Sequence, residues 1–86
     1  MISMYYVYFL LSLKNNNLYV GSTENVKVRF KRHNSGKVKS TKAYCPWRLL
    51  GYKEFPTRSE AIEMEKFYKT HQQKDLLKIE YGLVAK

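Results

Sequence analysis

The 86-residue sequence contains few residues that could crosslink it or anchor it in a membrane. Its one cysteine, Cys45, has no partner for an intrachain disulfide, and no cluster of cysteines and histidines suggests structural zinc. We therefore expect a protein of a reducing compartment. The most apolar stretch, Met4 to Leu13, is shorter than the roughly 20 residues that a transmembrane helix requires.

The same stretch lacks the basic flank and the small-residue cleavage site of a secretory signal. We expect a cytoplasmic protein without membrane association. The length allows one domain, residues 1–86. A chain of this size buries only about 60–65% of the surface that it exposes when unfolded, so its core is small.

Acidic residues are scarce, since 7 Asp and Glu face 16 Lys and Arg and the formal charge is +9. No acidic residue lies between Asn25 and Lys53. A one-sided basic block is typical of a protein that binds the phosphates of nucleic acid; the alternative is a solvated surface that maintains solubility. The residues that we expect to contact nucleic acid are Lys27, Lys31, Arg32, Lys37, Lys39, Lys42 and Arg48.

Aromatic residues, in contrast, are abundant, and eight of them are tyrosines. Tyr5 to Leu11 is apolar or aromatic on both alternating faces, which predicts a central strand covered on both sides. An asparagine-rich turn separates it from Leu18 to Gly21, and this pattern predicts a β-hairpin. Trp47 to Phe55 predicts a third strand, with a bulge at Gly51.

Two stretches have helical signals. The first predicted helix spans Asn25 to His33, after Ser22 or Thr23 as a cap. The second begins in a capping box at Thr57 and ends near residue 70, and a short helical segment is expected at Leu76 to Tyr81. The order β-β-α-β-α predicts an α+β fold, a small three-stranded antiparallel or mixed sheet flanked by helices.

The second predicted helix has a carboxylate in its apolar stripe. Ala61 and Tyr68 belong to this stripe, and Glu65 falls within it. A carboxylate on an apolar face is costly unless it has a partner. Periodicity leaves two interpretations open, an ion pair with Arg29 or Arg48, or a bound metal ion.

The first predicted helix places Arg29 and His33 on one face, because they are four residues apart. His33 alone could equally be a buried or surface histidine without a catalytic role. A guanidinium can stabilise the charge of a phosphodiester under attack, and one carboxylate can hold a divalent cation. A tyrosine or histidine can accept a proton from water.

Taken in order, these residues resemble the GIY-YIG nuclease domain, which occurs in homing endonucleases, restriction enzymes, excision-repair nucleases and small single-domain proteins. Tyr6-Val7-Tyr8 stands where the family has Gly-Ile-Tyr, and Tyr19-Val20-Gly21 stands where it has Tyr-Ile-Gly. The stretches VKVRFKRHNSG and SEAIEMEKF carry the helix Arg, His and Glu of the family. The resemblance covers about residues 5–70, and the stretch HNSGKVKSTK is similar to the small single-domain branch.

The resemblance implies an endonuclease that cuts DNA by in-line attack of water with one Mg²⁺ or Mn²⁺ ion, and it suggests a link to DNA repair. Tyr8 would be the base or would orient the water, and Tyr19 would position the phosphate or water. Arg29 would stabilise the transition state. His33 would hold Tyr8 or the nucleophile, or act as the base itself. Glu65 would be the only protein ligand of the metal.

The sequence also departs from the family. Tyr6 replaces the first glycine, and no asparagine follows Asn34, although the family often has one in its last helix. The nearest amides there are Gln72 and Gln73, and this difference puts the level of activity in question.

Three functions remain open on these grounds. They are a DNA endonuclease selective for substrate structure rather than sequence, a nucleic-acid-binding module with little or no cleavage, and a basic structural protein. RNA is a further candidate partner, and a partner protein or a homodimer could supply targeting. Glu65 separates the functions, because only the nuclease requires a carboxylate in the apolar stripe.

Overall fold

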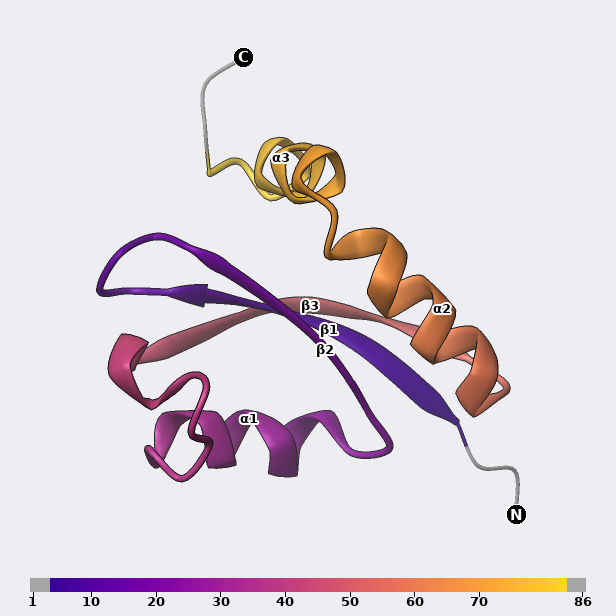
Figure 1. The fold of residues 1–86 in the computed structure, drawn as a ribbon, viewed down its shortest axis with the longest axis horizontal. Helices are drawn as coiled ribbons and strands as arrows, with labels where there is room; N and C mark the ends of the chain where they lie inside the picture. The colour runs from indigo at the N-terminus through magenta and orange to yellow at the C-terminus, as the bar shows by residue number, and fades with distance from the viewer. Residues whose placement is uncertain (1–3, 84–86) are drawn as a thin grey trace.

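The computed structural model describes residues 4–83, so the ends of the expected domain, residues 1–3 and 84–86, lie outside the described residues. The elements are β1 (Tyr5–Ser12), β2 (Leu18–Thr23), α1 (Val26–Asn34), the 3₁₀ helix η1 (Lys42–Tyr44), β3 (Trp47–Phe55), α2 (Arg58–Tyr68) and α3 (His71–Glu80). The sheet has the order β2-β1-β3 and both pairings are antiparallel. Figure 1 shows α1 on one side of the sheet and α2 and α3 on the other. The predicted α+β fold with a three-stranded sheet is confirmed.

The alternation along β1 divides the core into two layers. Val7, Phe9 and Leu11 face α2 and α3, where they pack with a cluster made of Leu18, Val20, Ala61 and Leu77. Tyr8 and Leu10 face α1 and pack with Trp47. Both faces of β1 are therefore covered, as its sequence predicts, and β2 and β3 form the two edges.

The ladder between β1 and β3 contains a bulge. Phe9 pairs with Gly51, whereas Leu10 pairs with Leu49, so Leu50 is the extra residue, next to the predicted position. Gly51 has a further role, because a Cβ atom there would lie 2.5 Å from the hydroxyl of Tyr81. The missing side chain lets Tyr81, which follows α3, pack against the sheet.

Each of the three helices begins at a side chain that caps it. Asn25 accepts a hydrogen bond from the backbone N–H of residue 28, Thr57 from that of residue 60, and Thr70 from that of residue 73. The expected caps at Ser22 or Thr23 are wrong, because β2 continues through both residues.

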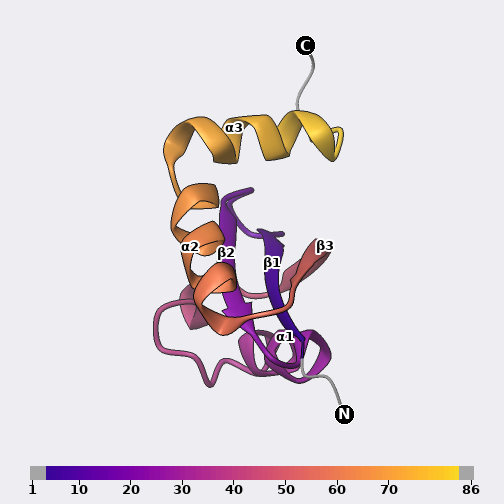
Figure 2. The same ribbon diagram turned by 90° about the vertical axis from the view of Figure 1, so that its right-hand side faces the viewer.

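The start of the last helix also differs from the prediction. It begins at His71, five residues before the expected Leu76, because Thr70 caps it there. The polar run after residue 70 forms the first turn of this helix, and Leu77 is its buried residue. Figure 2 shows α3 crossing the end of the sheet where the β1–β2 turn lies. No helix within residues 4–83 is long and apolar enough to cross a membrane.

Candidate active site

Three rings meet on the α1 side of the hairpin. Tyr8 comes from β1, Tyr19 from β2 and His33 from the last turn of α1. The ring centroids of each pair are between 4.9 and 6.2 Å apart. Tyr8 and His33 are buried, whereas Tyr19 is partly exposed. The cluster therefore has one ring that a ligand can reach from solvent.

A chain of hydrogen bonds runs inward from Tyr8. Its hydroxyl oxygen lies 2.8 Å from Nε2 of His33, and Nδ1 of His33 lies 2.7 Å from the hydroxyl of Thr41. Thr41 can donate its own proton to the carbonyl oxygen of Val38, at 3.4 Å. We therefore assign the proton of the imidazole to Nδ1, so that Nε2 accepts a hydrogen bond from Tyr8.

Burial keeps both members of this pair neutral. It raises the pKa of Tyr8 to about 12, although the nearby Arg29 guanidinium acts in the opposite direction. Burial also lowers the pKa of His33 to about 4, and the charges of Arg29 and Arg32 lower it further. At neutral pH the pair is a phenol that donates to a neutral imidazole.

Gly21 leaves room for the Tyr8 ring. It lies opposite Tyr8 in the β1–β2 register, and a Cβ atom there would lie 2.5 Å from the Tyr8 hydroxyl and 3.0 Å from Cε2 of Tyr19. A Cβ atom does not approach another heavy atom so closely, and Tyr8 is buried and cannot easily move away. The position therefore requires glycine if the ring is to stay in place.

Arg29 lies one helical turn before His33 and beside Tyr8. Its Nε is buried and has no hydrogen-bond partner among the described residues. A buried donor without a partner costs about 1–3 kcal/mol. An anionic ligand with an oxygen at this position would supply the missing acceptor.

Glu65 approaches the site from α2. Ser22 donates a hydrogen bond of 2.5 Å to its Oε1, and Nζ of Lys69 lies 2.7 Å from its Oε2. Burial alone would raise the pKa of this carboxyl, but Lys69 and Ser22 outweigh burial and hold it below its ordinary value. The ion pair with Arg29 or Arg48, one of the two interpretations left open for this carboxylate, is wrong, because the partner is Lys69, the residue that follows α2.

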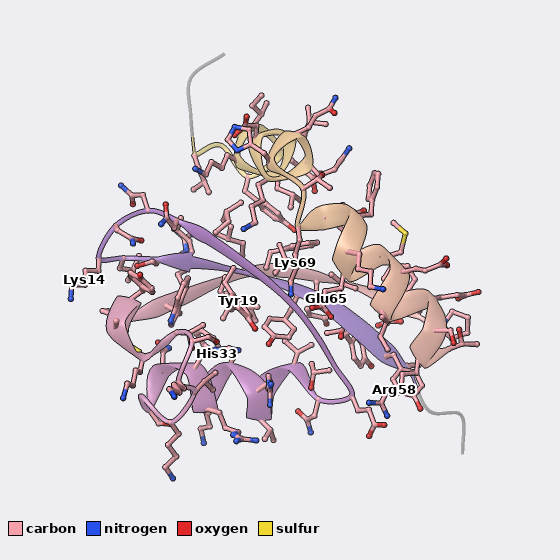
Figure 3. The ribbon with its side chains drawn as sticks, in the orientation of Figure 1. Lys14, Tyr19, His33, Arg58, Glu65 and Lys69 are labelled. Atoms are coloured by element: carbon pink, nitrogen blue, oxygen red, sulfur yellow. The ribbon has the colours of Figure 1, made fainter. Side chains whose placement is uncertain are left out.

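The edge strand β2 separates Glu65 from the rings. Along this strand Tyr19 packs in the α1 layer, Val20 packs in the α2 layer, and Ser22 contacts Glu65 on the α2 side. Figure 3 shows Tyr19 and Glu65 in the region between α1 and α2. The carboxylate is near enough that its charge raises the pKa of Tyr8 further, after the larger effect of burial. The site therefore extends around the edge of the sheet.

Glu65 is the side chain of this site that suits a divalent cation. No group of three His, Cys, Asp or Glu within residues 4–83 could hold one. Mg²⁺ nevertheless needs only one or two carboxylates, because it keeps several waters and takes phosphate oxygens. Glu65 is ionised at neutral pH, and Lys69, which is 46% exposed, is free to turn away from it. The donor set fits one hydrated ion.

The predicted nucleic-acid-binding residues are all exposed. Six of them belong to α1 or to the segment from its end to η1, namely Lys27, Lys31, Arg32, Lys37, Lys39 and Lys42. Arg48 is separate from them, because it pairs with Leu11, whose side chain faces α2 and α3. The basic surface of the chain is therefore mainly the α1 side.

Thr41, Ser22 and Lys69 make contacts in the site that the sequence pattern did not predict. Lys69 had a signal, because it lies four residues after Glu65 and such pairs meet on a helix. The position of Ser22 in the sequence was misleading, because a serine just before a helical pattern suggests a helix cap and not a contact with Glu65. Thr41 had no signal, because its position depends on how the segment after α1 folds back.

The site thus brings together phenols, a neutral imidazole, a guanidinium and an ionised carboxylate. Groups of these kinds are able to carry out acid–base chemistry on an anionic substrate. The chain belongs to the GIY-YIG family, since the profile of the GIY-YIG catalytic domain matches residues 4–79. This is a family of nucleases, and the resemblance that the motifs suggest is confirmed.

The chain is similar to several UPF0213 proteins. One from Staphylococcus haemolyticus is 40% identical over 76 residues, which cover 87% of this chain and 92% of that protein. One from Bacillus licheniformis is 38% identical over 63 residues, 72% of this chain and 65% of that protein. The solution NMR structure of the UPF0213 protein BH0048 from Bacillus halodurans matches with a TM-score of 0.53 and 36% identity, over 86% of this chain and 81% of that one.

Proposed function

We propose that this protein is an endonuclease that hydrolyses phosphodiester bonds of DNA with one Mg²⁺ or Mn²⁺ ion, and that it selects substrates by structure rather than sequence. The proposal depends on one observation: two groups of side chains contact neighbouring residues of β2, Gly21 and Ser22. The hydrogen-bonded pair of Tyr8 and His33 lies against Gly21, and Glu65 is bound to Ser22.

Tyr8 and His33 together accept the proton of the attacking water. Since the pKa of Tyr8 is about 12, the free phenol is not a base at neutral pH. A water that enters beside the partly exposed Tyr19 therefore gives its proton to the Tyr8 oxygen, while the Tyr8 proton moves to Nε2 of His33 along the existing 2.8 Å contact. The pKa of His33, about 4 in the free protein because of burial, rises when the negative phosphodiester binds beside it.

Arg29 and Tyr19 hold the phosphate. The unpartnered Nε of Arg29 donates to a phosphoryl oxygen, where negative charge grows in the transition state. Tyr19 is the partly exposed member of the ring cluster and orients the phosphate from the solvent side. Glu65 would hold the divalent ion, which when bound supplies positive charge for the reacting phosphate and the leaving oxygen.

The lysines and arginines of the α1 side supply the remaining affinity for the nucleic-acid backbone. Such contacts carry little sequence information and weaken as salt rises. The proposed substrates are therefore nucleic acids of a particular shape, such as single strands, flaps or junctions. The same mechanism would apply if the substrate were RNA, or if a partner protein directed the enzyme to its substrate.

The test is cleavage of labelled single-stranded, duplex and branched DNA with Mg²⁺ or Mn²⁺. Glu65→Ala and Arg29→Ala are expected to lower the rate by about 10²–10³-fold, the usual cost of removing one transition-state contact. Glu63→Ala is the matched control, because Glu63 lies on the same helix and is exposed. Undiminished cutting by Glu65→Ala would reject the metal site.

A nucleic-acid-binding module with little cleavage is the second candidate. The ion pair between Glu65 and Lys69 favours it, because it neutralises the carboxylate on which the metal depends. This candidate predicts salt-sensitive DNA binding by the parent protein without cutting of any substrate shape.

A further inference from the structure

A cleft of about 350 Å³ opens beside the candidate active site. Arg29 and Arg32 of α1 line it on one side, and Arg58 of α2 lines it on the other. The end of β2, at Ser22 and Thr23, completes the wall. The cleft therefore adjoins the active site through Arg29 and Ser22 without containing the ring cluster.

None of the three arginines of this cleft forms an ion pair with a described residue. Within residues 4–83 the ion pairs are Lys69–Glu65 and His71–Asp75, so no arginine takes part in one. Glu24 also lines the cleft but forms no ion pair there. Gathered like charges repel one another, and an anion in the cleft would relieve this repulsion.

Arg58 is at a position where a cation does not favour the helix. It is the first residue of α2, after the cap Thr57, and the N-terminal end of a helix carries partial positive charge. A residue that breaks a local rule in this way is typical of a functional site. Figure 3 shows Arg58 at the start of α2, at the end of the molecule where α1 also begins.

We propose that this cleft binds a phosphate of the nucleic-acid strand next to the phosphate that is cut, and that Arg58 is the main contact from α2. The inference rests on the proposed function. A strand whose reacting phosphate is held by Arg29 would continue directly into a cleft that shares this residue. Guanidinium groups suit the task, since their planar donors match two phosphate oxygens at once.

The test measures binding separately from cleavage. Fluorescein-labelled single-stranded DNA is titrated in EDTA, which prevents cutting, and fluorescence anisotropy is recorded over a series of salt concentrations. Arg58→Ala is expected to weaken binding at least about tenfold, the loss of a charged hydrogen bond. It should also reduce the slope of log affinity against log salt by about 0.7, the value for one phosphate contact on a single strand.

Two variants provide the controls. Arg58→Lys keeps the charge, so it should retain the salt slope but lose several-fold in affinity, because the fork of donors is gone. Lys78→Ala removes the same formal charge from α3, which follows the opposite end of α2 from Arg58 and does not line the cleft, and should change affinity less than about twofold. An equal loss for Arg58→Ala and Lys78→Ala would overturn the inference, since only net charge would then matter.

Strand ends and internal phosphates are distinguished with oligonucleotides that carry a 5′-phosphate or a 5′-hydroxyl. We expect the penalty of Arg58→Ala to be the same for both. A penalty confined to the phosphorylated strand would overturn the assignment to an internal phosphate and would place a strand end in the cleft.

Failure of the cleft and failure of the proposed function give different results. If the parent protein never cuts DNA but Arg58→Ala binds DNA more weakly than the parent does, the phosphate site in the cleft is supported and the proposed nuclease activity is refuted. If the parent cuts and Arg58→Ala binds and cuts unchanged, the cleft alone is refuted. Arg58→Ala should unfold at the same or a higher temperature, because an unfavourable charge leaves the helix start, so a binding loss is not an unfolding effect.

Discussion

The two faces of the sheet differ in what they bury. The α2 and α3 face is filled by apolar side chains such as Val7 and Phe9, which need no hydrogen-bond partner. The α1 face buries Tyr8, His33 and Thr41, which form a continuous hydrogen-bonded chain. One face supplies stability through apolar burial, and this allows the other to hold groups that are costly to bury.

A pair of glycine substitutions gives the largest expected contrast between the faces. Gly21→Ala should displace the buried Tyr8, lower cleavage by at least about 10²-fold, and destabilise the fold by about 1–3 kcal/mol through overpacking. Gly51→Ala produces a similar clash on the other face, with the hydroxyl of Tyr81.

The Tyr81 ring is partly exposed and can move, so Gly51→Ala should keep its cleavage rate per folded molecule. Rates are compared after the folded fraction of each variant is measured by circular dichroism. Equal losses of activity in both variants would show that the α1 face has no special role.

The second prediction concerns acid. The pKa of His33 is about 4 in the folded protein because of burial, against an ordinary 6.5, so the unfolded chain binds more protons between these pH values. Stability should be complete above pH 6.5 and should fall as the pH drops toward 4, by about 3 kcal/mol at most. Urea unfolding at several pH values measures this, and His33→Gln should flatten the profile. His71→Gln, the same substitution at an exposed position, is the matched control.

Thr41→Val tests the inner end of the hydrogen-bonded chain. The change leaves the Nδ1 proton of His33 without an acceptor, which should cost about 1–3 kcal/mol of stability. It should also lower kcat by about 10–100-fold, because the tautomer is no longer fixed. Thr41→Ser keeps the hydroxyl and should restore both, and nitrogen NMR shifts of His33 report the tautomer directly. A wild-type kcat and tautomer in Thr41→Val would exclude this positioning role.

Lys69→Ala gives the smallest expected effect. The ammonium competes with a divalent cation for Glu65, so its removal should lower the Mg²⁺ concentration for half-maximal cleavage by about two- to fivefold. Lys66→Ala is the control, because Lys66 acts on Glu65 only through its charge. A higher Mg²⁺ requirement in Lys69→Ala would mean that Lys69 assists the site instead.

The sequence predicts the elements whose signals are local. The bounds of β3, Trp47–Phe55, agree with the prediction, because a run of aromatic and branched residues ends at a proline. The misplaced start of α3 has a physical reason, since polar residues at the start of an amphipathic helix resemble a loop. Capping by Thr70 was the signal that could have corrected this.

The candidate site is only partly local. Arg29 and His33 are neighbours on one helix, so their common face follows from spacing. The bond of His33 to Thr41 and that of Glu65 to Ser22 join segments whose approach depends on the folded chain. The same is true of the cleft, because Arg58 meets Arg29 only when α1 and α2 are placed on opposite faces of one sheet.

The position of β2 at the edge of the sheet affects which substrates can reach the candidate active site. A polymer can lie along a rim anywhere in its length, whereas a tunnel admits it only by an end. Strands that are closed, branched or joined to long duplex arms can all be presented to a group such as Tyr19 without being threaded.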